Sequence, residues 1–288
     1  MASRLVGILF DGVAYGSLLF LISLGLSVTM GLMNVVNLAH GAFAMFGGYL
    51  SAWLMTRWQV PFLLTLPIAF VALGLSGAVL ERLFYRRLYT RSHLDQVLFT
   101  IGLTFMAVAT ATYLFGPGEQ LVTLPRALQG QVEVFGLGLG RYRLFLVAVV
   151  SLLLVALTHL VERTRFGAQL RAAVDNPRVA AGVGIPVGRV FCLTFALGSG
   201  LAGLGGALGI DILGLEPSFA LEYLVYFLLV VAVGGAGSMR GAAIGALVLG
   251  VCDVAGKYFV PELGAFIIYV LMIFMLVLFP GGLAARRV

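Results

Sequence analysis

The chain has 288 residues, of which 61% are hydrophobic and only 10% are charged, and its formal net charge is +6. A soluble globular protein carries about a quarter charged residues, so this composition excludes that class and indicates a polytopic integral membrane protein. The positive charge comes mostly from arginines between the apolar runs, which is typical of membrane topology rather than of nucleic-acid binding.

The membrane-crossing segments are expected to be helices. Backbone groups inside a bilayer need internal hydrogen-bond partners, and the apolar runs here approach the length of about 20 residues that a helix needs, without the alternation of barrel strands. This predicts an all-α polytopic fold of eight to nine transmembrane helices, in a single permease domain over residues 1–288. The expected spans are Leu5–Thr29, a second that ends near Arg57, Pro61–Leu80, Val97–Phe115, Leu144–Val161, Val190–Ile210, Leu224–Val233, Ala242–Val251 and Ala265–Phe279.

Three polar residues stand in the apolar stretch from Gly31 to Leu50. Asn34, Asn37 and His40 recur every three residues, so on a helix they share one face. Burying such groups costs about 1 to 3 kcal/mol each unless they find partners, so we expect this face to line the bundle interior or a wet cavity. It is our candidate translocation path. The alternative is a cytoplasmic turn between two spans with the asparagines as caps, and a re-entrant segment here would lower the count from nine to eight.

The arginine-rich loops predict the orientation. The stretch at residues 81–95 contains four arginines and is therefore expected in the cytoplasm. The glycine-rich stretch Gly118–Arg143 is long enough for a small external hairpin. Placing 81–95, 162–189, Arg240 and the C-terminal tail inside puts 12 of the 18 Lys and Arg residues in the cytoplasm. The N-terminus is then outside and the C-terminus inside.

The loop at residues 162–189 has the strongest local signals. It contains five arginines and two acidic residues between two apolar runs. Asn176 followed by Pro177 is a helix start, because Asn can cap a free amide and Pro has none to cap, and Gly182 supplies a stop. We therefore predict a short cytoplasmic helix from Pro177 to about Ala181 that forms a docking surface. The alternative is an amphipathic connector lying on the lipid headgroups.

Two further patterns lie on either side of residue 210. The glycines from Gly198 to Gly209 formally match a dinucleotide-binding fingerprint, but no strand precedes them, so we interpret them as close helix packing. Asp211, Glu216 and Glu222 form a purely acidic turn, which is expected on the external side.

Catalytic chemistry is not indicated. Cys192 and Cys252 have no pair spacing for a disulfide or a metal, and no paired acids or activated nucleophile are present. We expect no metal site, no bound cofactor and no enzyme activity. A stand-alone channel or secondary carrier is the alternative function, and the apparent lack of mid-span carboxylates argues against it.

Six stretches in this order resemble one family over about residues 8 to 283: GLMNVVNLAHGAFAMFGGY, ERLFYRRL, TIGLTF with LFGPG, TRFGAQLRAAVDNPRVAAGVGI, VAVGGAGSMRGAAIGALVLG and FPGGL. The family is the permease subunit of branched-chain amino-acid ABC importers, specifically its H-type member. The resemblance implies a bacterial inner-membrane importer with a second permease subunit of the M type, two cytoplasmic ATPases that bind ATP, and a periplasmic solute-binding protein. Relatives also carry urea, short amides and aromatic acids, so the solute is not fixed.

The resemblance also implies roles for particular residues. The family's NFAH-G signature corresponds to Asn37–Gly41, with Leu38 in place of the usual aromatic residue, and its coupling segment corresponds to Gly167–Ile185. In the coupling segment we expect Arg171 and Arg178 to meet acidic groups of an ATPase. The candidate coupling residues are Arg171, Asp175, Asn176, Pro177, Arg178, Ala180 and Gly182. The candidates for receiving the binding protein are the stretch Gly118–Arg143 and the acidic residues Asp211, Glu216 and Glu222.

Overall fold

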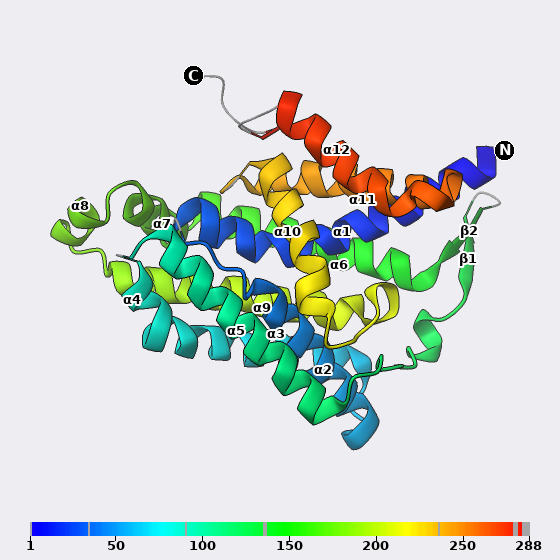
Figure 1. Cartoon of the computed structure of the whole chain (residues 1–288), viewed down its shortest axis with the longest axis horizontal. Coiled ribbons are helices and arrows are strands. Elements are labelled where there is room, and N and C mark those ends of the chain that lie inside the picture. The colour runs from blue at the N-terminus through cyan, green and yellow to red at the C-terminus, as the bar shows by residue number, and fades with distance from the viewer. Residues whose placement is uncertain are drawn as a thin grey trace.

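The computed structural model describes residues 2–33, 35–89, 91–134, 137–235, 237–278 and 282–283. Within these residues the chain forms a helical bundle with a small β-hairpin (Figure 1). The helices are α1 (Ala2–Leu32), α2 (His40–Trp58), α3 (Phe62–Leu80), α4 (Arg86–Leu88), α5 (His93–Phe115), α6 (Arg141–Arg163), α7 (Arg165–Asp175), α8 (Pro177–Gly182), α9 (Val187–Leu213), α10 (Phe219–Gly234), α11 (Met239–Phe259) and α12 (Gly264–Leu278). The hairpin pairs β1 (Gln131–Val134) with β2 (Leu137–Gly140) in antiparallel register.

Six segments of the described chain are long and apolar enough to cross a membrane: Arg4–Met30, Phe62–Leu88, His93–Phe115, Arg141–Arg163, Val187–Leu213 and Met239–Phe259. Two shorter apolar helices, Phe219–Gly234 and Phe266–Leu278, accompany them. The chain is therefore an all-α polytopic membrane protein, as its composition predicts. The hairpin confirms the small hairpin that was expected within Gly118–Arg143.

Two boundaries differ from the sequence prediction. The stretch Gly31–Leu50 is not one helix, because α1 ends at Leu32 and residues 35–39 are non-helical before α2 begins. The arginine-rich stretch that was expected as a loop continues the helix of α3 through a π-helical turn, Glu81–Tyr85, into α4. A π-helical turn inserts an extra residue per turn and is often found at functional sites.

The core is built around α9, whose glycines let neighbouring backbones approach closely. A Cβ atom at Gly206 would overlap the carbonyl oxygen of Ala44 in α2, and a Cβ at Gly47 would overlap that of Gly203. Large side chains at these positions would hold the helices apart, so the glycines permit backbone-to-backbone packing. The prediction of close packing in Gly198–Gly209 is confirmed, since added Cβ atoms at Gly200, Gly203 and Gly206 would clash with atoms of α3 or α2.

Helices α2 and α10 both begin inside the bundle. Each follows a long helix and a non-helical segment, which includes residues 35–39 before α2 and consists of residues 214–218 before α10. The two starts touch, because a Cβ atom at Gly41 would lie 2.6 Å from the carbonyl oxygen of Ala220. Figure 1 shows α2 and α10 leaving this junction in opposite directions. The molecule therefore contains two similar helix–segment–helix units of opposite orientation.

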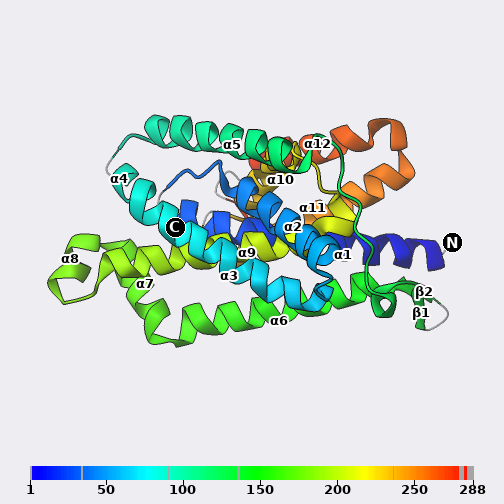
Figure 2. The ribbon, with the colours of Figure 1, turned by 90° about the horizontal axis from the view of Figure 1, so that it is seen from below.

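The long helices run between two distinct ends of the molecule. Helices α4, α7 and α8 lie at one end, and the start of α1 and the hairpin lie at the other (Figures 1 and 2). We call these the elbow end and the hairpin end.

Candidate functional site

The elbow (residues 162–189) carries α7 and α8, and local side chains explain where α8 begins and ends. Asn176 Oδ1 accepts a hydrogen bond from the Val179 N–H at 3.1 Å, which satisfies an amide that has no partner within the helix. Pro177 occupies the first helical position. Helix α8 ends at Gly182, one residue later than predicted, and Gly184 follows with a positive φ of 87°. The predicted helix is confirmed.

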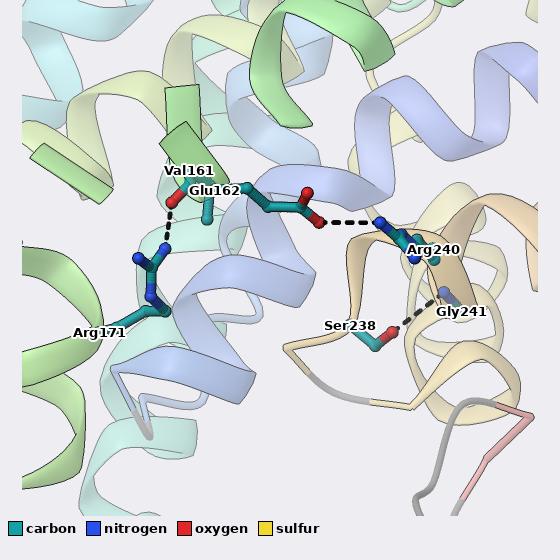
Figure 3. Close-up of polar contacts among 6 residues, drawn as sticks. All are labelled: Val161, Glu162, Arg171, Ser238, Arg240 and Gly241. Carbon is teal, nitrogen blue, oxygen red and sulfur yellow. Dashed lines mark hydrogen bonds and ion pairs between the residues drawn. The ribbon is translucent and has the colours of Figure 1, made fainter. Parts of the chain in front are cut away.

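The junction between α6 and α7 is close-packed. A Cβ atom at Gly167 would overlap the Val161 carbonyl oxygen, so glycine is required there. Thr164 Oγ1 caps α7 by accepting from the Gly167 N–H at 3.3 Å, and the Arg171 guanidinium donates a hydrogen bond to the same Val161 carbonyl oxygen (Figure 3). Arg171 therefore ties the elbow to the last turn of α6.

A small apolar core holds the elbow against the bundle. Leu170, Ala173 and Val190 are buried in it, so α7 rests on the first turns of α9. Ala180 is also buried, at 3% exposure. A larger side chain at Ala180 would therefore distort the elbow itself, because this position faces the interior and not a partner protein.

The outer face of the elbow is apolar and basic. Val179 and Val183 are 61% and 73% exposed, and Arg178 is exposed beside them. Sequence reasoning missed both valines, although residues four apart share a helix face and the buried Ala180 directs these two outward. The remaining candidate coupling residues at this tip are also exposed: Asp175, Asn176, Pro177 and Gly182.

An exposed ion pair joins α6 to α11 at the same end. Arg240 Nη2 lies 3.2 Å from Glu162 Oε1, and Ser238 Oγ caps α11 by accepting from the Gly241 N–H at 3.0 Å (Figure 3). Such a pair contributes at most about 1 kcal/mol. It places Arg240 beside the elbow, at the end where it was expected.

The predicted polar face does not exist as a helical stripe. Asn34 lies outside the described residues, and Asn37 is in the non-helical segment, one residue before a turn. Asn37 Oδ1 accepts from the Tyr85 hydroxyl at 2.8 Å, and His40 Nε2–H donates to the Ile22 carbonyl oxygen at 2.7 Å. The common-face prediction was wrong because the helix breaks between these residues. A turn is present at residues 38–39, but Asn37 does not cap α2, because its side chain bonds to Tyr85 and Ala39 precedes the helix without a side-chain cap.

The hydrogen bonds of Asn37 and His40 fix the α2 start in place. Both side chains are 1% exposed, and Gly41 follows at the contact with α10. These three residues therefore build the junction between the two opposed helix starts.

Two buried carboxylates were missed by the sequence reasoning. Glu81 and Asp253 are each 1% exposed. Glu81 begins the π-helical turn that follows α3, and Asp253 lies within the apolar helix α11. Glu81 Oε1 accepts from the Tyr89 hydroxyl at 2.8 Å, and Asp253 Oδ2 pairs with Lys257 Nζ at 2.6 Å. Each has a second oxygen without a partner among the described residues. The spacing of Asp253 and Lys257, four residues apart in an apolar run, was a signal that the sequence did contain.

The acidic turn lies at the hairpin end. Gln120 N–H donates to the Leu215 carbonyl oxygen at 2.8 Å, so the chain that leads into the hairpin packs on the segment at 214–218. Asp211 and Glu222 are exposed, and Glu216 is half-buried and accepts from the Ser218 hydroxyl. The three acidic residues therefore lie in or beside the partly buried segment 214–218, far from the elbow.

Comparison with known proteins identifies similar chains over almost the whole length. Residues 8–276 match the family described as the permease component of the branched-chain amino acid transport system. The chain is 28% identical to the high-affinity branched-chain amino acid transport system permease protein LivH of Salmonella typhimurium, over 96% of this chain and 94% of the relative.

Permeases of two other organisms are also similar to the chain. The chain is 25% identical to the high-affinity permease protein BraD of Pseudomonas aeruginosa, over 96% of this chain and 95% of that protein. It is 26% identical to a probable LivH permease of Methanocaldococcus jannaschii, over 96% and 91%. No solved structure is detectably similar to the chain.

Proposed function

The chain belongs to the family of branched-chain amino acid transport permeases and is an H-type member of it, and on that premise we propose that it is the membrane-spanning subunit of an ATP-driven importer. The solutes are branched-chain amino acids or related small polar, amide or carboxylate compounds. The partners are a second permease subunit of the M type, two cytoplasmic ATPases that bind ATP, and a periplasmic solute-binding protein. The location is the bacterial inner membrane.

The proposed topology has nine crossings. The six long apolar segments account for six of them. Helices α2 and α10, each with the non-helical segment that leads into it, and the short α12 supply the other three. An odd number places the termini on opposite sides, with the N-terminus outside and the elbow in the cytoplasm, which agrees with the arginine distribution.

The observation that carries this proposal is the elbow. The capped helix α8 and the residue after it expose Arg178, Val179 and Val183 away from the bundle. Arg171 and Gly167 of α7 fasten the elbow to α6. The exposed valines and the adjacent Arg178 would fit an apolar cleft with acidic groups on an ATPase. Closure of the ATPases would move the elbow as a unit, and the bundle is the two-state element that this motion biases.

Charge reversal at the tip tests this coupling. We expect Arg178→Glu to lower ATP-dependent uptake by more than about tenfold, because it places like charges together in the proposed contact. Membrane insertion should be unchanged, since the side chain is exposed. The measurement is uptake into proteoliposomes that contain the whole complex. Arg87→Glu is the matched control, an exposed arginine of α4 outside the elbow, and equal effects of the two changes would refute the coupling role.

The junction of α2 and α10 is the proposed support of the translocation path. Helices that begin within a membrane protein's interior place their amide ends near solute sites in interrupted transporters. We propose that Asn37, His40 and Gly41 hold these starts in register. His40→Ala should then change both the rate and the apparent affinity of uptake, and wild-type values for both would show that the junction is only structural.

The hairpin end is the proposed receiving surface for the binding protein. Asp211, Glu216 and Glu222 lie on it, and the loop that begins at Gly118 packs against the same segment. Charge removal at Asp211 and Glu222 should weaken stimulation of the ATPases by the loaded binding protein without affecting their basal rate.

A stand-alone channel or secondary carrier is the alternative. The predicted lack of mid-span carboxylates no longer argues against it, because Asp253 is buried within the apolar helix α11. The two functions differ in their energy source. Solute uptake by the purified chain without ATPases would support the carrier, whereas uptake that requires ATP and the ATPases would support the importer.

A further inference from the structure

An apolar groove runs between α3 and α9. Its volume is about 570 Å³. Its lining extends from Phe70 in α3 to Arg82 in the π-helical turn that follows, and along α9 from Arg189 to Leu197. Figure 2 looks onto α3, which lies along α9. Twelve helical steps correspond to about 18 Å, close to one leaflet of a hydrocarbon core about 30 Å thick.

Small residues form the floor of the groove, and larger ones form its walls. Gly74 lies close to α9, since a Cβ atom there would be 3.1 Å from the Ala196 carbonyl oxygen, and Ala196 itself lines the groove. Leu75 and Val79 of α3, at 63% and 55% exposure, and Leu193 of α9, at 54%, stand on either side. The side chains therefore form a narrow apolar groove that is open along its length.

The elbow end of the groove is cationic. Arg82 and Arg189 line it there, and an adjoining cavity of about 410 Å³ adds Arg86. None of the ion pairs among the described residues involves these three arginines. The carboxylate in that cavity, Glu81, is 1% exposed and already accepts a hydrogen bond from Tyr89.

An amphiphile with one anionic end matches this combination. Phospholipids are the main membrane molecules that combine long apolar chains with an anionic group. Their acyl chains would fill the groove, which is about one leaflet long, and their phosphates would contact the arginines at its end. Basic pockets between helices on the cytoplasmic side are typical binding sites for anionic headgroups. We propose that the groove between α3 and α9 is a binding site for an anionic phospholipid, held by Arg82, Arg86 and Arg189.

Native mass spectrometry of the full-length chain tests this site. The chain, purified in detergent with any subunits that accompany it, is titrated with phosphatidylglycerol or with phosphatidylcholine of the same acyl chains. We expect selective retention of phosphatidylglycerol. Arg82→Gln and Arg189→Gln should each weaken the retention of phosphatidylglycerol about fivefold. This factor corresponds to the contribution of about 1 kcal/mol that a basic residue makes at an anionic membrane surface. Ala196→Leu, which fills the floor, should weaken retention of both lipids.

Matched controls separate this site from general surface charge and surface area. Arg87→Gln removes an exposed arginine that does not line the groove, and Ala148→Leu enlarges an exposed position on α6. Neither should change retention. Equal retention of the two lipids, or an unchanged titration in the Arg82→Gln/Arg189→Gln double variant, would overturn the proposal, as would crosslinks that place a second copy of the chain over the groove. The titration contains no solute and no ATP, so its outcome is independent of the transport function.

Discussion

Ionised side chains inside a membrane protein are costly unless they are paired, and Asp253 meets this requirement through Lys257. The carboxylate is 1% exposed, whereas the lysine side chain is half exposed and lies 5.7 Å from the ring centroid of Tyr15. The lysine thus neutralises a buried charge while keeping its own ammonium group partly accessible. The pair explains how the apolar helix α11 carries a buried carboxylate.

Replacing one partner of this pair should destabilise the chain more than replacing both. We expect Lys257→Met to lower the free energy of unfolding by about 1 to 3 kcal/mol, because it leaves Asp253 buried without its partner. The loss should be less than that of a fully buried pair, since Lys257 is half exposed. The Asp253→Asn/Lys257→Met double variant should recover part of the loss, as measured by thermal unfolding in detergent. Additive losses in the double variant would contradict the pairing.

At the scale of the elements, glycines decide which helices touch. Helix α9 packs against α2 through backbone contacts at Gly206 and Gly47, whereas Gly102 in the middle of α5 has no neighbour within 4 Å of an added Cβ. The same residue type therefore has opposite roles in two helices. In α9 it permits packing, and in α5 it only weakens the helix.

A pair of glycine substitutions separates these roles. Gly206→Ala should lower stability and membrane yield, because α2 and α9 must move apart to admit the methyl group. Gly102→Ala should instead stabilise the chain by about 0.5 to 1 kcal/mol, from helix propensity alone. Thermal unfolding of both variants in the same detergent checks the signs. A destabilised Gly102→Ala variant, or a tolerated Gly206→Ala variant, would disprove this account of the packing.

At the scale of the whole molecule, the chain has two chemically different ends. The elbow end carries α8 with its exposed tip and the arginines beside the groove, and the hairpin end carries the acidic turn and the β-hairpin (Figure 1). Each end has its own ion pair: Arg143 pairs with Asp11 near the hairpin, and Arg240 pairs with Glu162 near the elbow. Different partners are therefore expected on the two membrane faces.

Cysteine labelling measures this polarity. In a chain whose two cysteines are replaced by alanine, Asp175→Cys in the elbow should react with a membrane-impermeant maleimide only in inverted vesicles. Val132→Cys in the hairpin, a position that is 37% exposed, should react only in intact spheroplasts. The two positions act as controls for each other, and labelling of Asp175→Cys from outside would reverse the proposed orientation.

The sequence by itself determined the class of protein, the helix at Pro177 and the small hairpin, because composition reports the class of the whole chain and capping acts over a few neighbouring residues. It also located the family through stretches spread along the chain. Only the tertiary structure decided that Asn37 bonds to Tyr85, 48 residues away, that Ala180 faces inward, and that Glu81 and Asp253 are buried. Burial and hydrogen-bond partners depend on which distant helices pack together, and no local pattern along one helix carries that information.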